Sequence, residues 1–147
     1  MNCRTVCNID LSVQIIYFMS SDICSLAVIG DGAVGKTSII NTFRSDGFGK
    51  SYKQTVGVDF FEKLLNIKGD KYVSLRVWDI GGQSINSKNL QKYLASSQII
   101  FLVYDVTNIE SFNNLEDWLR MARRCSKASF IYVVGNKVLI NLSSIMY

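Results

Sequence analysis

Residues 30–37 have the types and the spacing needed to bind phosphate. Gly30 and Gly35 frame four residues, and Lys36 and Thr37 follow directly. Glycines let backbone N–H groups curl around an anion, a lysine adds a cation, and a threonine hydroxyl is a ligand that Mg²⁺ accepts. The pattern predicts a polyphosphate and magnesium site in this segment, called the phosphate loop below. The alternative is a chance glycine turn with a solvated lysine.

The sequence on either side of the phosphate loop favours the phosphate interpretation. Four apolar residues, 26–29, predict a buried strand before it, and Ile39, Ile40 and Phe43 follow it at helical spacing. The start of a helix carries unpaired N–H groups and a partial positive charge, which attract an anion. Lys36 would stand where the helix dipole disfavours a cation, and this placement is explained if a polyphosphate binds there.

Further strands and helices can be predicted along the chain. Residues 58–67 and 72–78 read as two strands that a tight turn joins, while 99–104 and 130–134 read as buried strands. A weak helical pattern covers about 87–96.

A second, stronger helix is predicted after residue 107. Thr107 and Glu110 have the spacing of a capping box at its start. Four apolar residues then fall on one face of the helix, which we expect to be buried: Phe112, Leu115, Leu119 and Ala122.

Strands that alternate with helices predict an α/β fold, with a mainly parallel sheet, helices on both faces and one antiparallel strand from the hairpin. Ligands bind beyond the carboxyl ends of the strands of such sheets. Four residues fall at these ends: Gly30, Asp79, Asp105 and Asn136. Asp79 would hold Mg²⁺, Thr55 would complete the metal shell, and Gln83 would orient a water molecule toward a terminal phosphate.

Composition narrows the class of protein. The chain has 147 residues, of which 48% are hydrophobic, so one domain with a core is expected. The net charge of +4 comes from scattered residues, which indicates no nucleic-acid surface. Four cysteines show neither zinc nor disulfide spacing and suit a reducing compartment as free thiols. No apolar run is long enough for a transmembrane segment.

The motifs together resemble Rab-type small GTPases of the Ras superfamily, over about residues 25–137. The segments that carry the resemblance are 30–37, Thr55, 56–60, 78–83, 102–108, 111–115 and 136–137. Segments 48–50 and 59–61, together with Gly81 and Gly82, are similar to the Rab branch numbered twenty-eight. The resemblance implies a domain at 24–137 with a P-loop NTPase fold, after an extension of unclear structure at 1–23.

The resemblance also implies a role for each matching residue. The phosphates of GTP or GDP would contact the phosphate loop and its continuation, namely Gly32, Ala33, Val34, Gly35, Lys36, Thr37 and Ser38. Mg²⁺ would be held by Thr37, Thr55 and Asp79. Gly82 would sense the γ-phosphate and Gln83 would position the attacking water. Phe48, Asn136 and Lys137 would contact the base and ribose.

The function implied is a cytoplasmic switch in vesicle trafficking that hydrolyses GTP slowly. Loops 44–60 and 80–95 would change with the γ-phosphate and contact effectors, an exchange factor and an activating protein.

Three features depart from the family pattern. Leu139 stands where the family has the aspartate that selects guanine. The helix, strand and helix that end the family domain are not in this sequence, and the atypical tail 138–147 has no cysteine for prenylation. Two alternatives therefore stay open: a truncated, non-catalytic isoform or pseudo-GTPase with weak, unselective nucleotide binding, and an ATP-dependent P-loop enzyme. Gly81 to Gln83 and the pair Asn136 and Lys137 argue against the second.

Overall fold

The computed structural model describes residues 22–44, 55–68, 70–83 and 88–138. Along the chain the elements are β1 (Ile23–Ile29), α2 (Lys36–Arg44), β2 (Val58–Lys68), β3 (Lys71–Ile80), α3 (Lys88–Ala95), β4 (Ile99–Asp105), α4 (Ile109–Asn113), α5 (Leu115–Cys125) and β5 (Phe130–Asn136). The predicted order of strands and helices is confirmed, although each of the five strands is longer than predicted.

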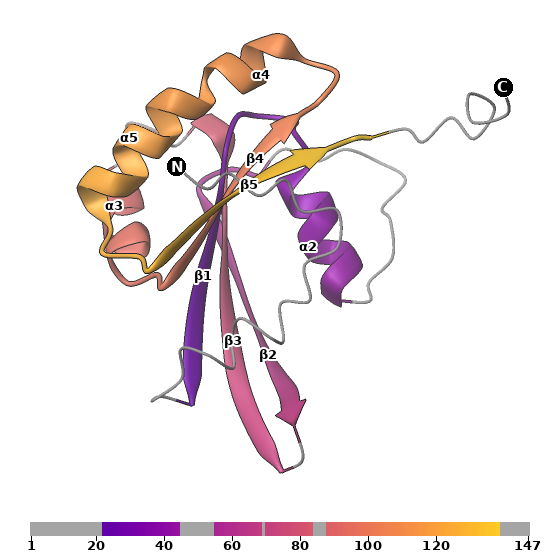
Figure 1. Ribbon diagram of the computed structural model, residues 1–147, viewed down its shortest axis with the longest axis vertical. Helices are drawn as coiled ribbons and strands as arrows, with labels where there is room; N and C mark the ends of the chain where they lie inside the picture. The colour runs from indigo at the N-terminus through magenta and orange to yellow at the C-terminus, as the bar shows by residue number, and fades with distance from the viewer. Residues whose placement is uncertain (1–21, 45–54, 69, 84–87, 139–147) are drawn as a thin grey trace, which may run out of the picture.

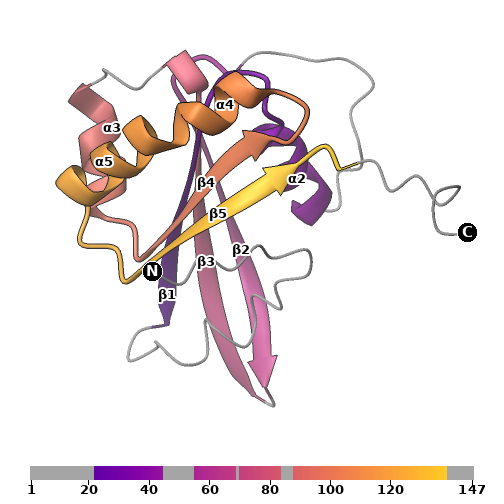
Figure 2. The ribbon, with the colours of Figure 1, turned by 45° about the horizontal axis from the view of Figure 1, so that its top comes forward.

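The five strands form one sheet in the order β2-β3-β1-β4-β5 (Figure 1). Among the described strands only β2 and β3 pair antiparallel, and β3, β1, β4 and β5 pair in parallel. In Figure 2, α3 and α5 lie on one side of the sheet and α2 lies on the other. The predicted α/β architecture, with a mainly parallel sheet and helices on both faces, is confirmed.

A separate hydrophobic core fills each face of the sheet. Because side chains alternate along a strand, Cys24, Leu26 and Val28 of β1 pack on the face covered by α2. Ala27 and Ile29 pack on the opposite face with residues of α3 and α5. All five are at most 6% exposed, so β1 is the centre of both cores and holds the phosphate loop at its end.

The strand register brings together the residues that were predicted to lie at the carboxyl ends of the strands, called the rim of the sheet below. In the parallel pairs, Val28 lies opposite Asp79 and Ile29 lies opposite Leu102. Asp105 lies opposite Asn136 at the last pair of β4 and β5. The carboxyl ends of four strands therefore meet at one edge of the sheet, where a ligand site is expected.

The helix after β4 differs from the prediction in two ways. Its N-cap is Asn108, whose side chain accepts hydrogen bonds from the N–H groups of Glu110 and Ser111, so the predicted capping box is wrong. The Thr107 hydroxyl instead donates to Asp105 at 2.7 Å. The helix also breaks at Asn114 into α4 and α5.

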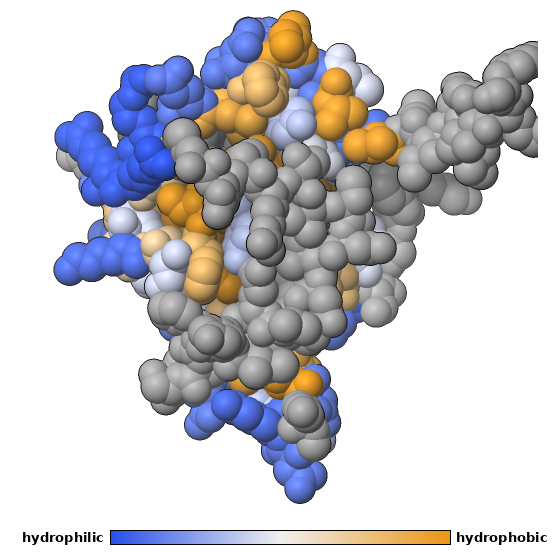
Figure 3. Space-filling model, viewed as in Figure 1, coloured by the Kyte–Doolittle hydropathy of each residue, from blue (hydrophilic) through white to orange (hydrophobic). Residues whose placement is uncertain are grey.

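The break at Asn114 changes which residues are buried. Phe112 was expected in the core but is 51% exposed, while Trp118 and Ala122 of α5 are fully buried. Phe112 packs edge-on against Tyr104, with ring centroids 5.3 Å apart. Other exposed apolar side chains at the start of α4 are those of Val106 and Ile109. Figure 3 shows hydrophobic side chains at the top of the molecule, where α4 lies in the same view in Figure 1.

β5 was expected to be a buried strand, and its burial is less than expected. Every residue of β5 is only half-buried, because the strand lies at the edge of the described sheet. The two described cysteines, Cys24 and Cys125, are free thiols, as predicted. Burial raises the pKa of the Cys24 thiol above its ordinary value.

Candidate functional site

The phosphate loop turns sharply between β1 and α2. Three of its residues have positive φ angles: Gly30 at 140°, Ala33 at 61° and Gly35 at 96°. Gly30 also lies against β4, since a Cβ atom placed there would be 2.1 Å from the Val103 carbonyl oxygen. Val34 is buried, and Gly32 and Ala33 are exposed at the tip. This left-handed path is the backbone conformation that forms an anion-binding concavity.

Lys36 is buried at the base of the loop, with 6% of its surface exposed. Its ammonium group donates hydrogen bonds to the carbonyl oxygens of Gly30 at 2.8 Å and Asp31 at 2.6 Å. Burial lowers the pKa of Lys36 to about 8, and the negative charges of Asp79 and Asp31 partly oppose that shift. An ammonium group has three N–H donors, and two of those of Lys36 bond to carbonyl oxygens. Lys36 is therefore a partly desolvated cation with a further donor for a ligand at the loop.

Thr37, Thr55 and Asp79 form an oxygen cluster beside Lys36. The Thr37 hydroxyl donates to Asp79 Oδ2 at 2.6 Å, and the hydroxyl oxygens of Thr37 and Thr55 are 2.8 Å apart. Burial raises the pKa of Asp79, while the hydrogen bond from Thr37 and the charge of Lys36 oppose the rise. Thr37 is the second residue of α2, Asp79 is the last but one of β3 and Thr55 precedes β2, so the fold assembles three separate segments.

The oxygen cluster fits Mg²⁺. Asp79 Oδ1 is buried and has no hydrogen-bond partner among the described residues. Because buried polar atoms are normally paired, this oxygen fits a metal ligand. The described residues contain no group of three His, Cys, Asp or Glu side chains that could hold a metal. One carboxylate with hydroxyl oxygens suits Mg²⁺, which protein sites bind through few carboxylates together with substrate phosphates and water.

The segment after β3 lies against the phosphate loop. A Cβ atom on Gly82 would be 2.1 Å from the Gly32 nitrogen, so only glycine permits this approach. The Gly81 N–H donates to the Gly57 carbonyl at 2.8 Å, which joins the two stretches predicted to act as switches. Gln83 is exposed beside them.

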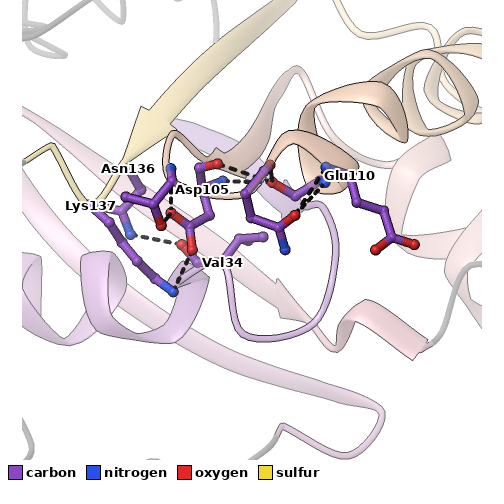
Figure 4. Close-up of polar contacts among 8 residues, drawn as sticks. Val34, Asp105, Glu110, Asn136 and Lys137 are labelled. Carbon is purple, nitrogen blue, oxygen red and sulfur yellow. Dashed lines mark hydrogen bonds and ion pairs between the residues drawn. The ribbon is translucent and has the colours of Figure 1, made fainter.

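Asn136 and Lys137 lie at the end of β5, close to the phosphate loop (Figure 4). The Asn136 amide donates to the Val34 carbonyl at 2.8 Å. Lys137 has a φ of 63°, and its ammonium group is 2.7 Å from Asp105 Oδ2. Hydrogen bonds from Lys137 and then Thr107 lower the pKa of Asp105 to about 2.

Sequence comparison assigns the chain to a family. Residues 25–144 match the model of the Ras family. The chain belongs to the Ras family. Its relatives include the Ras-related protein Rab-28 of Caenorhabditis elegans, 45% identical over 119 residues, which are 78% of this chain and 48% of that protein.

Two further relatives of this Ras-family chain are Rab or Ypt/Rab proteins. The Ypt/Rab-type GTPase YPT7 of Saccharomyces cerevisiae is 35% identical over 80% of this chain and 59% of its own length. Rab-10 of Caenorhabditis elegans is 38% identical over 76% of this chain and 56% of its own length. The predicted resemblance to Rab-type small GTPases, and to the branch numbered twenty-eight, is confirmed. The chain spans about half the length of these curated relatives.

The structure brings together most of the residues that the sequence singled out. The phosphate loop and Ser38 supply Gly32 to Ser38, and the loop is contacted by Thr55, Asp79, Gly82 and Asn136. Lys137 lies beside Asp105. Phe48 and Leu139 lie outside the described residues. No described helix has the length and apolar character required to cross a membrane.

Sequence reasoning missed three residues. Asp31 lies within the phosphate loop, and Asn114 and Trp118 contact it there. The Asp31 carboxylate accepts hydrogen bonds from the Asn114 amide at 2.8 Å and the Trp118 indole at 2.7 Å. Asp31 occupies a variable position of the loop motif, so the motif gave it no role. The spacing of Asn114, Trp118 and Ala122, four residues apart, is the signal that could have shown one helix face turned inward.

Proposed function

We propose that this chain binds Mg²⁺ with GDP or GTP, hydrolyses GTP slowly and acts as a Rab-type switch in membrane trafficking. The observation that carries the proposal is the oxygen cluster of Thr37, Thr55 and Asp79, set beside a buried Lys36 at the end of a glycine loop. Family membership and the Rab relatives support the same proposal.

In the proposed complex, one set of residues would bind the phosphates of the nucleotide and another set would bind its base. Backbone N–H groups of residues 32–37 would hold the α- and β-phosphates, and Lys36 would exchange its carbonyl partners for phosphate oxygens. When bound through Thr37, Thr55 and Asp79, Mg²⁺ would neutralise charge on the phosphates. Asn136 would brace the loop through Val34 and contact the purine, with Lys137 along its ring.

Hydrolysis needs a water molecule in line with the γ-phosphate. Gly82 packs against the loop at Gly32, and the next residue, Gln83, is exposed. Gln83 would orient that water with its amide group. Because the intrinsic rate of such enzymes is low, an activating protein could accelerate hydrolysis.

A row of three aromatic rings, of which Phe60 is exposed and Trp78 and Tyr93 are half-buried, supports the proposed partner surface. Phe60 and Trp78 have ring centroids 4.6 Å apart, and Trp78 and Tyr93 are 4.8 Å apart. Phe60 belongs to loop 44–60 and Tyr93 to loop 80–95, and Phe60 is 44% exposed. A partner that binds this row would contact both switches, and a change in either one would alter its affinity.

The alternative function is a non-catalytic form with weak, unselective nucleotide binding, and Leu139 favours it. The nucleotide content of the purified protein tests the proposal against both alternatives. Guanine nucleotide released on denaturation supports the proposal, adenine nucleotide supports an ATP-dependent enzyme, and a mixture or none supports the non-catalytic form.

Replacing Lys36 by alanine is expected to weaken the binding of fluorescent GDP roughly 10- to 150-fold in the presence of Mg²⁺. The change removes a charge-assisted hydrogen bond to phosphate, which contributes roughly 1.5–3 kcal/mol. Lys71→Ala removes the same charge from an exposed site on β3 and serves as the control. Equal affinities of the Lys36→Ala and parent proteins would contradict the assigned role.

Replacing Gln83 by leucine is expected to slow GTP hydrolysis roughly tenfold or more and to leave GTP affinity unchanged. The intrinsic rate of such enzymes is on the order of 10⁻⁴ s⁻¹, so single-turnover measurement is required. Gln91→Leu, the same change at an exposed position of α3, is the matched control. If both variants hydrolyse GTP at the parent rate, Gln83 has no part in the mechanism.

A further inference from the structure

Helix α5 reaches the phosphate loop through the side chain of Asp31. Trp118 Nε1–H donates to Asp31 Oδ1 at 2.7 Å, across 87 residues of sequence. Asn114 Nδ2–H donates to Asp31 Oδ2 at 2.8 Å, across 83 residues. Each carboxylate oxygen therefore has its own donor, one from Asn114 at the N-cap of α5 and one from Trp118 within α5.

Both donors are held in place by the rest of the fold. Trp118 is 1% exposed and packs in the core that α3 and α5 form with the sheet, so its indole ring is fixed by close packing. Asn114 is the residue at which α4 gives way to α5, and its side chain makes no helix-capping hydrogen bond. The Asn114 amide is therefore not used for capping and donates to Asp31 instead.

Asp31 is in turn joined to the groups that would handle phosphate. Its carbonyl oxygen accepts a hydrogen bond from Lys36 at 2.6 Å. A Cβ atom on Gly82 would lie 2.4 Å from the Asp31 carbonyl carbon. Asp31 therefore contacts both the proposed phosphate-binding lysine and the glycine at the γ-phosphate end.

The charge of Asp31 gives the two donors a second effect. A carboxylate in an anion-binding loop attracts Lys36 and repels phosphate. Hydrogen bonds from Trp118 and Asn114 hold this carboxylate on the side of α5. Without them the carboxylate would be free to approach the Lys36 ammonium group and compete with phosphate for it.

We propose that Trp118 and Asn114 are positioning residues, which act through Asp31 to fix the phosphate loop in its binding conformation and to keep the carboxylate away from Lys36. The inference rests on the proposed function, because it names what holds that same site. It also predicts that the effect falls on the phosphate part of a nucleotide and not on the base.

The first test compares GDP with GMP, which lacks the β-phosphate, on the full chain with Mg²⁺. Trp118→Phe keeps a ring in the core and removes the donor, and it is expected to weaken GDP binding roughly tenfold while GMP affinity changes much less. Asn114→Ala, at a partly buried position, should act in the same direction. Leu119→Ala is the control, since it loosens α5 packing without contact to Asp31.

A double-mutant cycle tests whether the effect passes through Asp31. Trp118→Phe should have no further effect on GDP affinity in an Asp31→Ala background, because the group that it positions is gone. Additive effects, or a loss in Leu119→Ala as large as in Trp118→Phe, would overturn the proposal. Failure of the parent chain to bind GDP would overturn the proposed function, which is a different result.

The contact itself is testable without nucleotide. The chain has two tryptophans, so its indole N–H resonances can be assigned with Trp118→Phe or, if that variant does not fold, with Trp78→Phe. Asp31→Asn should move the Trp118 resonance and leave that of Trp78 in place, because only the Trp118 indole donates to this carboxylate. An unmoved Trp118 resonance would overturn the proposal.

Discussion

Replacing Leu139 by aspartate is expected to raise the affinity for GDP relative to ADP roughly 10²-fold or more. The resemblance to Rab-type GTPases implies an aspartate at this position that would accept two hydrogen bonds from guanine, and leucine accepts none. Each buried donor left unpaired costs about 1–3 kcal/mol, and ~1.4 kcal/mol is tenfold in affinity. The phosphate loop makes no contact that distinguishes bases, so we expect the unmutated chain to select weakly among purine nucleotides.

The measurement is competition of GDP, IDP, XDP and ADP against a labelled nucleotide. Leu139→Asn is the control, since it has nearly the shape of aspartate but can accept only one of the two hydrogen bonds. It should restore less of the GDP preference than Leu139→Asp. Strong guanine selectivity in the unmutated chain would show that another residue recognises the base.

Replacing Gly30 by alanine is expected to lower the free energy of unfolding by about 2–6 kcal/mol. The alanine Cβ would lie 2.1 Å from the Val103 carbonyl oxygen, and the φ of 140° is strained for any L side chain. Overpacking contributes about 1–3 kcal/mol and backbone strain about 1–3 kcal/mol.

Gly32→Ala is the matched control for Gly30→Ala, because nothing lies within 4 Å of a Cβ atom at Gly32. Its unfolding free energy should stay within about 0.5 kcal/mol of the parent. Urea denaturation without nucleotide measures both variants. Equal midpoints for Gly30→Ala and the parent would show that the loop does not pack on β4 as described.

The parts of the candidate site that the sequence could predict are those with a local signal. The glycine spacing and Lys36 predict a phosphate loop from eight consecutive residues. Asp79 and Asn136 were placed because each follows a run of strand-forming residues, and parallel strands bring their carboxyl ends to one edge. The structure adds the contacts, such as Asn136 with Val34.

The errors arose where two local signals competed or where the deciding contact is distant. Thr107 and Asn108 are both good capping residues. The Thr107 hydroxyl donates to Asp105, and the Asn108 side chain caps the helix instead. The break at Asn114 shifts the buried face of the helix, so Trp118 is buried and Phe112 is not. Asp31 needs its partners in α5 to be recognised, and no local pattern connects them.

The rim of the sheet joins residues that lie far apart in the chain, from Gly30 through Asp79 to Asn136. Contacts of such long sequence separation close late in folding, because the entropy of the intervening loops must be lost first. A fragment that lacks β3 or β5 would therefore have the complete motif and an incomplete site, without Asp79 or without Asn136. Occupancy and folding are thermodynamically linked here, and a ligand at about 1,000 times its Kd would add roughly 4 kcal/mol to the stability of the whole sheet.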